Sequence, residues 1–178
     1  SYNRTMNMIK RVPWAKITGK TLSNLKSMQI RCLPEDDLVM PDKSTEGHWF
    51  LVHEHSYTNI PPILIAFAVM VESTKWYDTV YMSRCCVLPE FRGKGLQKRL
   101  LRARERHARA LGYTWAITDT RDNIPSSNSL ISCGYKLFEP TKPWSFEDSL
   151  YWRKKLCRTK TLKRKSKRTK NIVASGIR

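Results

Sequence analysis

Apolar residues recur at helical spacing in two long stretches of the chain. The first covers residues 18–33 and stops at Pro34, and the second covers about 95–111 and stops at Gly112. Proline cannot continue a helix, and glycine readily adopts the left-handed backbone that ends one. The pattern therefore predicts two substantial helices and a third, shorter one over residues 125–132.

Short runs rich in β-branched and aromatic residues lie around these helices. The most apolar run, residues 63–71, is about half of the roughly 20 residues that a membrane-spanning helix needs, so it predicts a buried strand. The predicted strands are residues 49–54, 63–72, 79–88, 113–119, 135–138 and 149–156, with a first strand within 1–16. Strands alternating with helices indicate an α/β fold, here a mixed central sheet flanked by helices on both faces.

The chain has 178 residues, which is enough for one packed domain and too few for two. Its formal net charge of +18 is unevenly placed, because residues 153–170 hold eleven Lys or Arg and no acid. We therefore expect one domain over residues 1–157 and a basic flexible tail over 158–178. Such a tail favours a nucleic-acid partner through counterion release, or else it only solubilises or localises the protein.

The predicted helix over residues 95–111 is also rich in basic side chains. We expect these side chains on its solvated face, opposite an apolar stripe that packs on the core. The basic set is Lys98, Arg99, Arg102, Arg104, Arg106 and Arg109, and the stripe is Leu96, Leu100, Ala103 and Leu111.

The five cysteines are odd in number, include the adjacent Cys85 and Cys86, and follow no obvious secretory leader. This usage favours reduced thiols in the cytoplasm. The sequence has neither a CxxC nor an HExxH motif, so we expect no metal site. No apolar run is long enough to predict a membrane span.

One predicted strand passes directly into a helix through a turn with two glycines. Gly93 and Gly95 let the backbone approach a ligand closely, and the new helix presents unpaired N–H groups and the positive end of its dipole. Arg92, Lys94 and Lys98 add positive charge at the same end. These features suit a pyrophosphate group.

This turn resembles the coenzyme A-binding motif of the GNAT N-acetyltransferase superfamily, Q/R-x-x-G-x-G/A, which follows a strand ending in V-x-P-E/D-Y/F. Residues 92–96 match the motif in order, whereas Gln97 stands where the family usually has Gly or Ala. We therefore expect a phosphate pocket of somewhat different shape.

A second block strengthens the resemblance. Asn123-x-x-Ser126 followed by Cys133-Gly134-Tyr135 resembles the family's N-x-x-A/S and G-F/Y pair at the expected spacing. Together the two blocks cover residues 81–138, about a third of the chain.

The resemblance implies a GNAT-like fold and an acyltransferase that uses acetyl-coenzyme A as cosubstrate. It implies that backbone groups of the strand before the motif line the pantetheine arm and that the motif holds the phosphates. The implied binding residues are Cys85, Cys86, Val87, Arg92, Gly93, Lys94, Gly95, Leu96, Gln97, Lys98, Asn123 and Ser126. Because no Cys-His-acid arrangement is readable, we expect direct attack by an amine in a ternary complex.

The general acid departs from the family's pattern. GNAT enzymes commonly place a tyrosine seven positions after the motif asparagine, and here that position is Leu130. Ser129, Ser132 or Tyr81 could substitute for it, or the thiolate could leave without a specific acid.

For the general base, two carboxylates end predicted central strands. Glu72 and Asp119 could reach the cleft directly or through a water molecule, or they could be solvated strand-end carboxylates. The candidate catalytic residues are therefore Asp119, Glu72 and Tyr81.

The sequence leaves the acceptor and the oligomeric state open. A primary amine of a small molecule, a polyamine or a protein is the leading class, with a nucleobase in DNA or RNA as the alternative because of the basic tail. A nucleic-acid-binding protein on a degenerate GNAT scaffold is a third hypothesis, motivated by Leu130 and Gln97. The aromatic residues Trp144, Phe146, Tyr151 and Trp152 could line the acceptor pocket or pack in the core.

Overall fold

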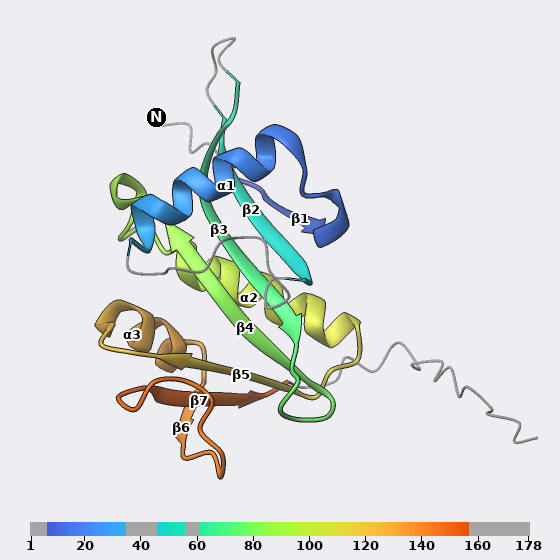
Figure 1. Cartoon of the computed structure of the whole chain (residues 1–178), viewed down its shortest axis with the longest axis vertical. Helices are drawn as coiled ribbons and strands as arrows, with labels where there is room; N and C mark the ends of the chain where they lie inside the picture. The colour runs from blue at the N-terminus through green and yellow to red at the C-terminus, as the bar shows by residue number, and fades with distance from the viewer. Residues whose placement is uncertain (1–6, 35–45, 56–60, 157–178) are drawn as a thin grey trace, which may run out of the picture.

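The computed structural model describes residues 7–34, 46–55 and 61–156 (Figure 1). Its strands are β1 (Ile9–Pro13), β2 (His48–Glu54), β3 (Ile63–Glu72), β4 (Thr79–Val87), β5 (Trp115–Thr120), β6 (Lys136–Phe138) and β7 (Leu150–Lys155). Its α-helices are α1 (Gly19–Cys32), α2 (Leu96–Ala110) and α3 (Ile124–Ser132). The predicted helices and the six strands with predicted bounds agree with these within two residues at each end, and the first strand is β1. The predicted tail, 158–178, lies outside the described residues.

The described strands form one seven-stranded sheet in the order β1-β2-β3-β4-β5-β7-β6. All neighbours are antiparallel except β4 and β5, which are parallel because α2 connects them across the sheet. Figure 1 shows α1 in front of the sheet and α2 behind it. The predicted mixed α/β fold with helices on both faces is confirmed.

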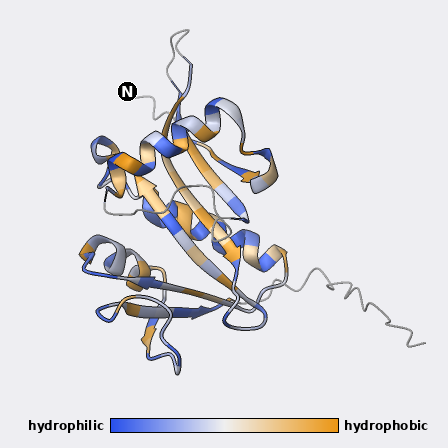
Figure 2. Cartoon of the chain, in the orientation of Figure 1, coloured by the Kyte–Doolittle hydropathy of each residue, from blue (hydrophilic) through white to orange (hydrophobic). Residues whose placement is uncertain are grey.

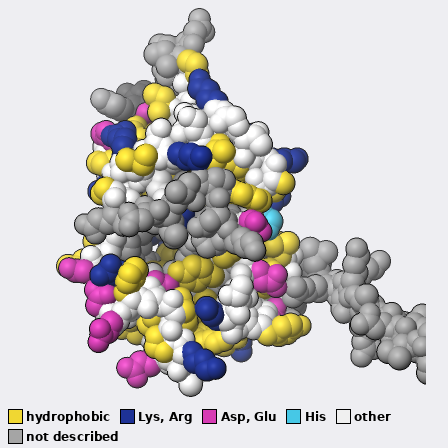
Figure 3. Space-filling view, viewed as in Figure 1, with side chains coloured by type: hydrophobic (Ala, Val, Ile, Leu, Met, Phe, Trp, Pro, Cys, Tyr) yellow, Lys and Arg dark blue, Asp and Glu magenta, His cyan; other side chains and the backbone are white. Residues whose placement is uncertain are grey.

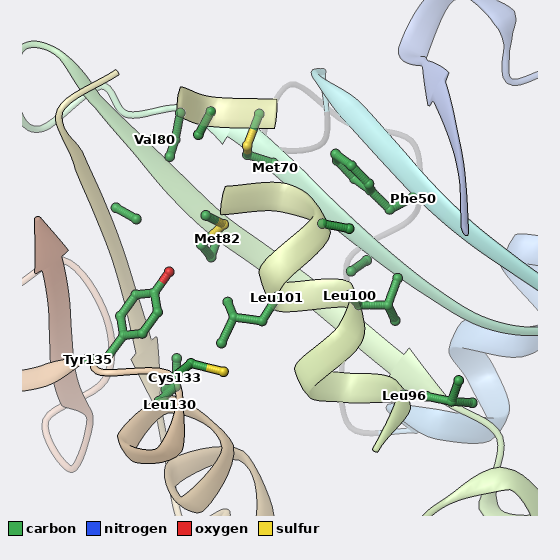
Figure 4. Close-up of a cluster of buried hydrophobic side chains, with 14 of the residues drawn as sticks. Phe50, Met70, Val80, Met82, Leu96, Leu100, Leu101, Leu130, Cys133 and Tyr135 are labelled. Atoms are coloured by element: carbon green, nitrogen blue, oxygen red, sulfur yellow. The ribbon is translucent and has the colours of Figure 1, made fainter. Parts of the chain in front are cut away.

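Each face of the sheet has its own core. On one face, Leu25 and Met28 of α1 pack against Trp49 and Phe67. Burying one such side chain contributes about 2 kcal/mol to folding. The other face packs on α2 and α3 through a set that includes Phe50, Met70, Met82, Leu96, Leu100, Leu101, Leu130 and Tyr135 (Figure 4). Figure 2 shows the hydrophobic residues gathered in the central strands, as expected for strands covered on both faces.

Strands β4 and β5 pair only at one end. The parallel pairing runs from Thr79↔Trp115 to Tyr81↔Ile117, although β4 continues to Val87 and β5 to Thr120. Figure 1 shows the two strands diverging toward α3. Beyond Tyr81, therefore, the β5-facing edge of β4 has no strand partner among the described residues.

A bulge interrupts β4 just after this point. Ala68 pairs with Cys85 and Met70 pairs with Met82, so two residues of β4, numbers 83 and 84, oppose the single residue Val69 of β3. A bulge bends a strand and redirects its backbone groups. Here it lies where β4 leaves β5.

Candidate active site

A cavity of about 940 Å³ opens where β4 and β5 separate. This volume lies within the range of small-molecule sites. The wall is formed by β4 (Tyr81, Met82, Ser83, Arg84, Cys85), the end of β5 (Thr118, Asp119, Thr120, Arg121), α2 (Gln97, Leu101, Arg104), α3 (Ser126, Ser129, Leu130), the end of α1 (Cys32, Leu33, Pro34) and Phe146. The site therefore draws on segments that are far apart in the sequence.

The glycine turn leads into the N-terminus of α2, beside this cavity. Gly93 and Gly95 both have φ of +75°, a conformation that other residues adopt only with strain. Gly95 is the N-cap of α2 and provides no side chain, so the first N–H groups of the helix have no side-chain cap. Arg92 donates from Nε to the Val87 carbonyl at 3.1 Å, and Lys94 lies over the Phe91 ring. An uncapped helix N-terminus among cations fits a diphosphate.

Gln97, at the atypical motif position, connects α2 to α3. Its Nε2 donates to Ser126 Oγ at 2.8 Å, and its Oε1 accepts from Ser129 Oγ at 3.4 Å. Asn123 caps α3 by accepting from the Ser126 N–H at 3.0 Å, and it does not line the cavity. The larger side chain thus ties the two helices together at the cavity wall, a contact that Gly or Ala could not make.

Asp119 lies at the end of β5 and is held by two donors. Tyr81 Oη donates to its Oδ1 at 2.5 Å, and Trp144 Nε1 donates to the same oxygen at 3.0 Å. Its Oδ2 makes no hydrogen bond with any residue of the described ranges. Burial, followed by the charge of Asp119, raises the pKa of Tyr81 well above its ordinary value, so this phenol stays a neutral donor.

The structure separates the predicted acid and base candidates. Asp119 and Tyr81 line the cavity, whereas Glu72 is exposed at the end of β3, paired with Val80 outside the cavity wall. Ser129 lines the cavity, but its Oγ donates to the Pro125 carbonyl at 2.9 Å. Ser132 is not part of the wall. Leu130 lines the cavity with an apolar side chain, so the position of the usual tyrosine offers no hydroxyl.

The three cysteines around β4 differ in position and acidity. Cys85 lines the cavity, and burial raises its pKa. Cys86 instead faces the core beneath α1, and its hydrogen bond to Cys32 raises its pKa. The same hydrogen bond lowers the pKa of Cys32 to about 7, with Arg92 and Arg31 contributing. All three are free thiols.

An aromatic cluster stands beside Asp119. It consists of Trp76, Phe138, Trp144 and Tyr151, with ring centroids 4.5 Å apart for Trp144 and Tyr151 and 5.1 Å apart for Trp76 and Phe138. The sequence suggested Trp144 and Tyr151 but missed Trp76 and Phe138, which come from a hairpin and a three-residue strand. Trp152 points to the other face and packs in the core. Phe146 lines the cavity beneath the Arg121 guanidinium.

Arg104 lines the cavity, and its predicted position was wrong. The prediction put it on the solvated face of the helix, whereas its side chain is 3% exposed and lines the cavity. The reason is helical spacing, because Arg104 is four residues after Leu100 and so shares the buried face. That spacing was a usable signal, although a basic residue is seldom placed in a core.

Within the described ranges, no three His, Cys, Asp or Glu side chains come together as a metal site. Of the helices that the structure describes, none combines the length and the apolar character that a membrane span requires.

Comparison with solved structures identifies proteins of similar fold. An IAA acetyltransferase from Bacillus cereus superimposes with a TM-score of 0.60 and 18% identity, over 84% of this chain and 99% of that one. The ribosomal-protein-S18-alanine N-acetyltransferase of Escherichia coli gives 0.62 and 16%, over 89% and 99%. A Salmonella typhimurium protein whose structure contains acetyl-CoA gives 0.51 and 19%, over 64% and 67%. At these identities the likeness concerns the fold.

Comparison at the level of sequence identifies the family. None of the curated proteins compared with the chain matches it. The Acetyltransferase (GNAT) family matches residues 25–135, which is more than half of the chain and includes both sequence blocks and most of the cavity wall. The protein therefore belongs to the GNAT family of acetyltransferases, whose cosubstrate is acetyl-coenzyme A.

Proposed function

We propose that this protein transfers the acetyl group of acetyl-coenzyme A directly to a primary amine in the cavity between β4 and β5. One observation carries the proposal: a single cavity lies between an uncapped helix N-terminus and a carboxylate held in place by two donors. The first feature suits a phosphorylated cosubstrate and the second suits an amine.

The turn before α2 would hold the diphosphate. The N–H groups at the start of α2 supply donors, and the charges of Arg92, Lys94 and Lys98 offset the anion. Beyond the bulge, the edge of β4 at residues 85–87 has no strand partner among the described residues, although the Val87 carbonyl already accepts from Arg92 and Cys32. This edge can pair with an extended amide-containing arm as a further strand would. The residues present therefore suit the diphosphate and the pantetheine arm of the cosubstrate.

Asp119 would bind the ammonium form of the acceptor and act as its general base. An alkylamine is mostly protonated at neutral pH, and only its neutral form attacks a carbonyl carbon. Oδ2 of Asp119 can attract the ammonium and take its proton, while Tyr81 and Trp144 hold the other oxygen. When bound, acetyl-coenzyme A supplies an activated acyl carbon, and its sulfur takes the departing electron pair.

The test combines binding with turnover. Calorimetry should show acetyl-coenzyme A binding to the full chain with 1:1 stoichiometry. A thiol-release assay against small amines, polyamines, peptides and oligonucleotides should then identify an acceptor by a rate above background hydrolysis. Absence of any heat with acetyl-coenzyme A would contradict the proposal.

An amine carried on a nucleic acid is a second candidate acceptor, favoured by another surface. A shallow hollow of about 310 Å³ is lined by Trp76, Tyr77, Thr79, Trp115 and Arg153. Trp115 and Asp119 lie on the same face of β5, because side chains alternate along a strand. Tyr77 is 93% exposed, whereas Trp76 and Trp115 are half-buried. Accessible rings beside cations bind single-stranded nucleic acid by stacking and charge.

The last described strand ends near this hollow. Lys155, the last residue of β7, pairs with Trp115, and residues 158–170 follow with eight Lys or Arg. On the face in Figure 3, by contrast, Lys and Arg side chains are interspersed with Asp and Glu, so the described domain presents no uniformly basic face there. Removing residues 158–178 should therefore weaken oligonucleotide binding and reduce its salt dependence. An unchanged salt slope would count against this candidate, and tight nucleic-acid binding without coenzyme A affinity would indicate a binding protein instead.

The free thiols also favour a reducing compartment of the cell. The four cysteines in the described ranges are unpaired with one another, although Cys32 and Cys86 are in hydrogen-bonding contact. Neighbouring thiols persist in a reducing compartment, which fits the cytoplasm.

A further inference from the structure

Arg104 places a buried positive charge in the wall of the cavity. Its side chain is 3% exposed and reaches from α2 to the central strands. Nη1 donates to the carbonyls of Val69 at 3.0 Å and Ser83 at 3.2 Å, and Nε donates to the Leu100 carbonyl at 3.4 Å. All of its acceptors are backbone oxygens.

No carboxylate of the described residues neutralises this charge. The adjacent Glu105 is engaged with Arg109 at 3.0 Å and Lys154 at 2.8 Å. A buried guanidinium without an acid partner is unfavourable, since a charge loses its hydration on burial. The carbonyls compensate only in part, so the cavity keeps a net positive charge at Arg104.

The guanidinium still has donors to offer. Its hydrogen bonds use Nε and Nη1, and Nη2 makes none with the described part of the chain. Because Arg104 lines the cavity, the remaining donors are available to a bound ligand. A ligand that gains negative charge would be the natural partner for them.

Apolar surroundings strengthen the electrostatic effect of that charge. Met82, Cys85, Leu101 and Leu130 line the same cavity, and their side chains exclude water from its inner wall. In such a medium a charge acts more strongly than in water. Leu130 also occupies the position where the resembled family commonly has a tyrosine acid.

We propose that Arg104 stabilises the negative charge that collects on the coenzyme A sulfur as the acetyl group leaves, in place of a proton donor at residue 130. This inference rests on the proposed function. A C–N bond forms, the C–S bond breaks, and its electron pair stays on sulfur. The bound ammonium loses two protons on the way to the amide: Asp119 takes the first and releases it to solvent before the attack, and it takes the second as the C–N bond forms. Arg104 keeps its charge and transfers no proton.

The inference can be tested by binding, without turnover. Calorimetry would compare coenzyme A with acetyl-coenzyme A between pH 7 and 9, since the two differ in having a free thiol. If Arg104 favours the thiolate, coenzyme A binding tightens relative to acetyl-coenzyme A as pH rises, by up to about tenfold for each unit by which the thiol pKa falls on binding. Phosphate and adenine titrations cancel between the two ligands.

Three variants assign the effect to Arg104. R104Q removes the charge and should abolish the pH-dependent gain, whereas R104K keeps the charge and should retain most of it. R102Q changes the same charge at an exposed position of the same helix and should behave like the wild type. Thermal unfolding of each variant checks that it folds.

The outcomes are distinct. If the wild type binds both ligands without any pH-dependent difference, the inference is overturned, even if R104Q does not fold. If R104Q and R104K lose the gain equally, Arg104 only anchors the β4 bulge, and the inference also fails. If the wild type binds neither ligand, the proposed function fails first.

Discussion

Tyr81 and Asp119 are hydrogen-bonded across the point where β4 and β5 part, at 2.5 Å between Oη and Oδ1. Tyr81 forms the last β4–β5 pair with Ile117, and Asp119 is two residues further along β5. The bond therefore joins the two strands at the start of the cavity. It also orients the carboxylate, leaving Oδ2 for a substrate.

Asp119→Asn should remove the proton acceptor while keeping the shape of the side chain. We expect kcat to fall by about 10²- to 10³-fold, in the range for the loss of a general base. Steady-state kinetics with the acceptor found in the screen measures this. Asp122→Asn, an exposed neighbour, is the matched control and should keep full activity. A fall of less than threefold in the first variant would exclude Asp119 as the base.

Tyr81→Phe should have a smaller effect, because the phenol orients Asp119 and transfers no proton. Losing one hydrogen bond to a charged group lowers stability by about 1 to 3 kcal/mol. Since the pKa of Tyr81 is raised, the wild type and the variant should share the same pH–rate profile up to about pH 10. If an alkaline limb below that pH disappeared in the variant, Tyr81 would be an acid after all.

Gly95→Ala should weaken acetyl-coenzyme A binding. An L side chain at φ of +75° strains the backbone by about 1 to 2 kcal/mol and shifts the N–H groups that begin α2. We expect at least tenfold weaker binding by calorimetry. Gly19→Ala is a suitable control, because Gly19 also has positive φ, at +56°, and open space around it, but begins α1. Equal losses of affinity in both variants would mean that the turn has no specific role.

Direct transfer predicts that the cavity thiols are dispensable. The double variant Cys32→Ser and Cys85→Ser should keep kcat within about threefold of the wild type, because no acyl group passes through cysteine in this mechanism. Cys32 is the critical position, since its pKa is lowered to about 7 and it lines the cavity. Mass spectrometry after incubation with acetyl-coenzyme A alone should find no stable acetyl-cysteine. A large loss of kcat together with such an adduct would favour a covalent route.

Acid should destabilise the fold through His107. Burial, followed by the charges of His48 and Arg11, lowers its pKa to about 4. The unfolded chain takes up a proton near pH 6.5 while the folded chain does not, so this contribution is present above pH 6.5 and is lost as pH falls toward 4. Between pH 7 and 5 we expect His107 to account for about 1 kcal/mol, discounted for partial exposure. Urea unfolding of the wild type and of His107→Gln at both pH values should show a smaller loss in the variant.

The amino-acid sequence determined those features of the protein that depend on neighbouring residues. The turn with Gly93 and Gly95 was readable because left-handed backbone and a helix start are local properties. Pro34 and Gly112 mark helix ends for the same reason. The continuous apolar run of β3 was likewise readable as a buried strand, because nine apolar residues in a row are a local property of the sequence.

Only the tertiary structure decided what depends on distant segments. β7 enters the sheet between β5 and β6, β4 parts from β5 after Tyr81, and both follow from pairings between segments remote in sequence. These pairings turn Asp119 toward Tyr81 and Trp144 but leave Glu72 outside the cavity. Arg104 shows the limit most clearly. Its buried position follows from helical spacing, yet two of its carbonyl partners, Val69 of β3 and Ser83 in the β4 bulge, come from strands that are remote from α2 in sequence. Local preferences are set by a few dihedral angles, whereas such contacts need the whole sheet in place.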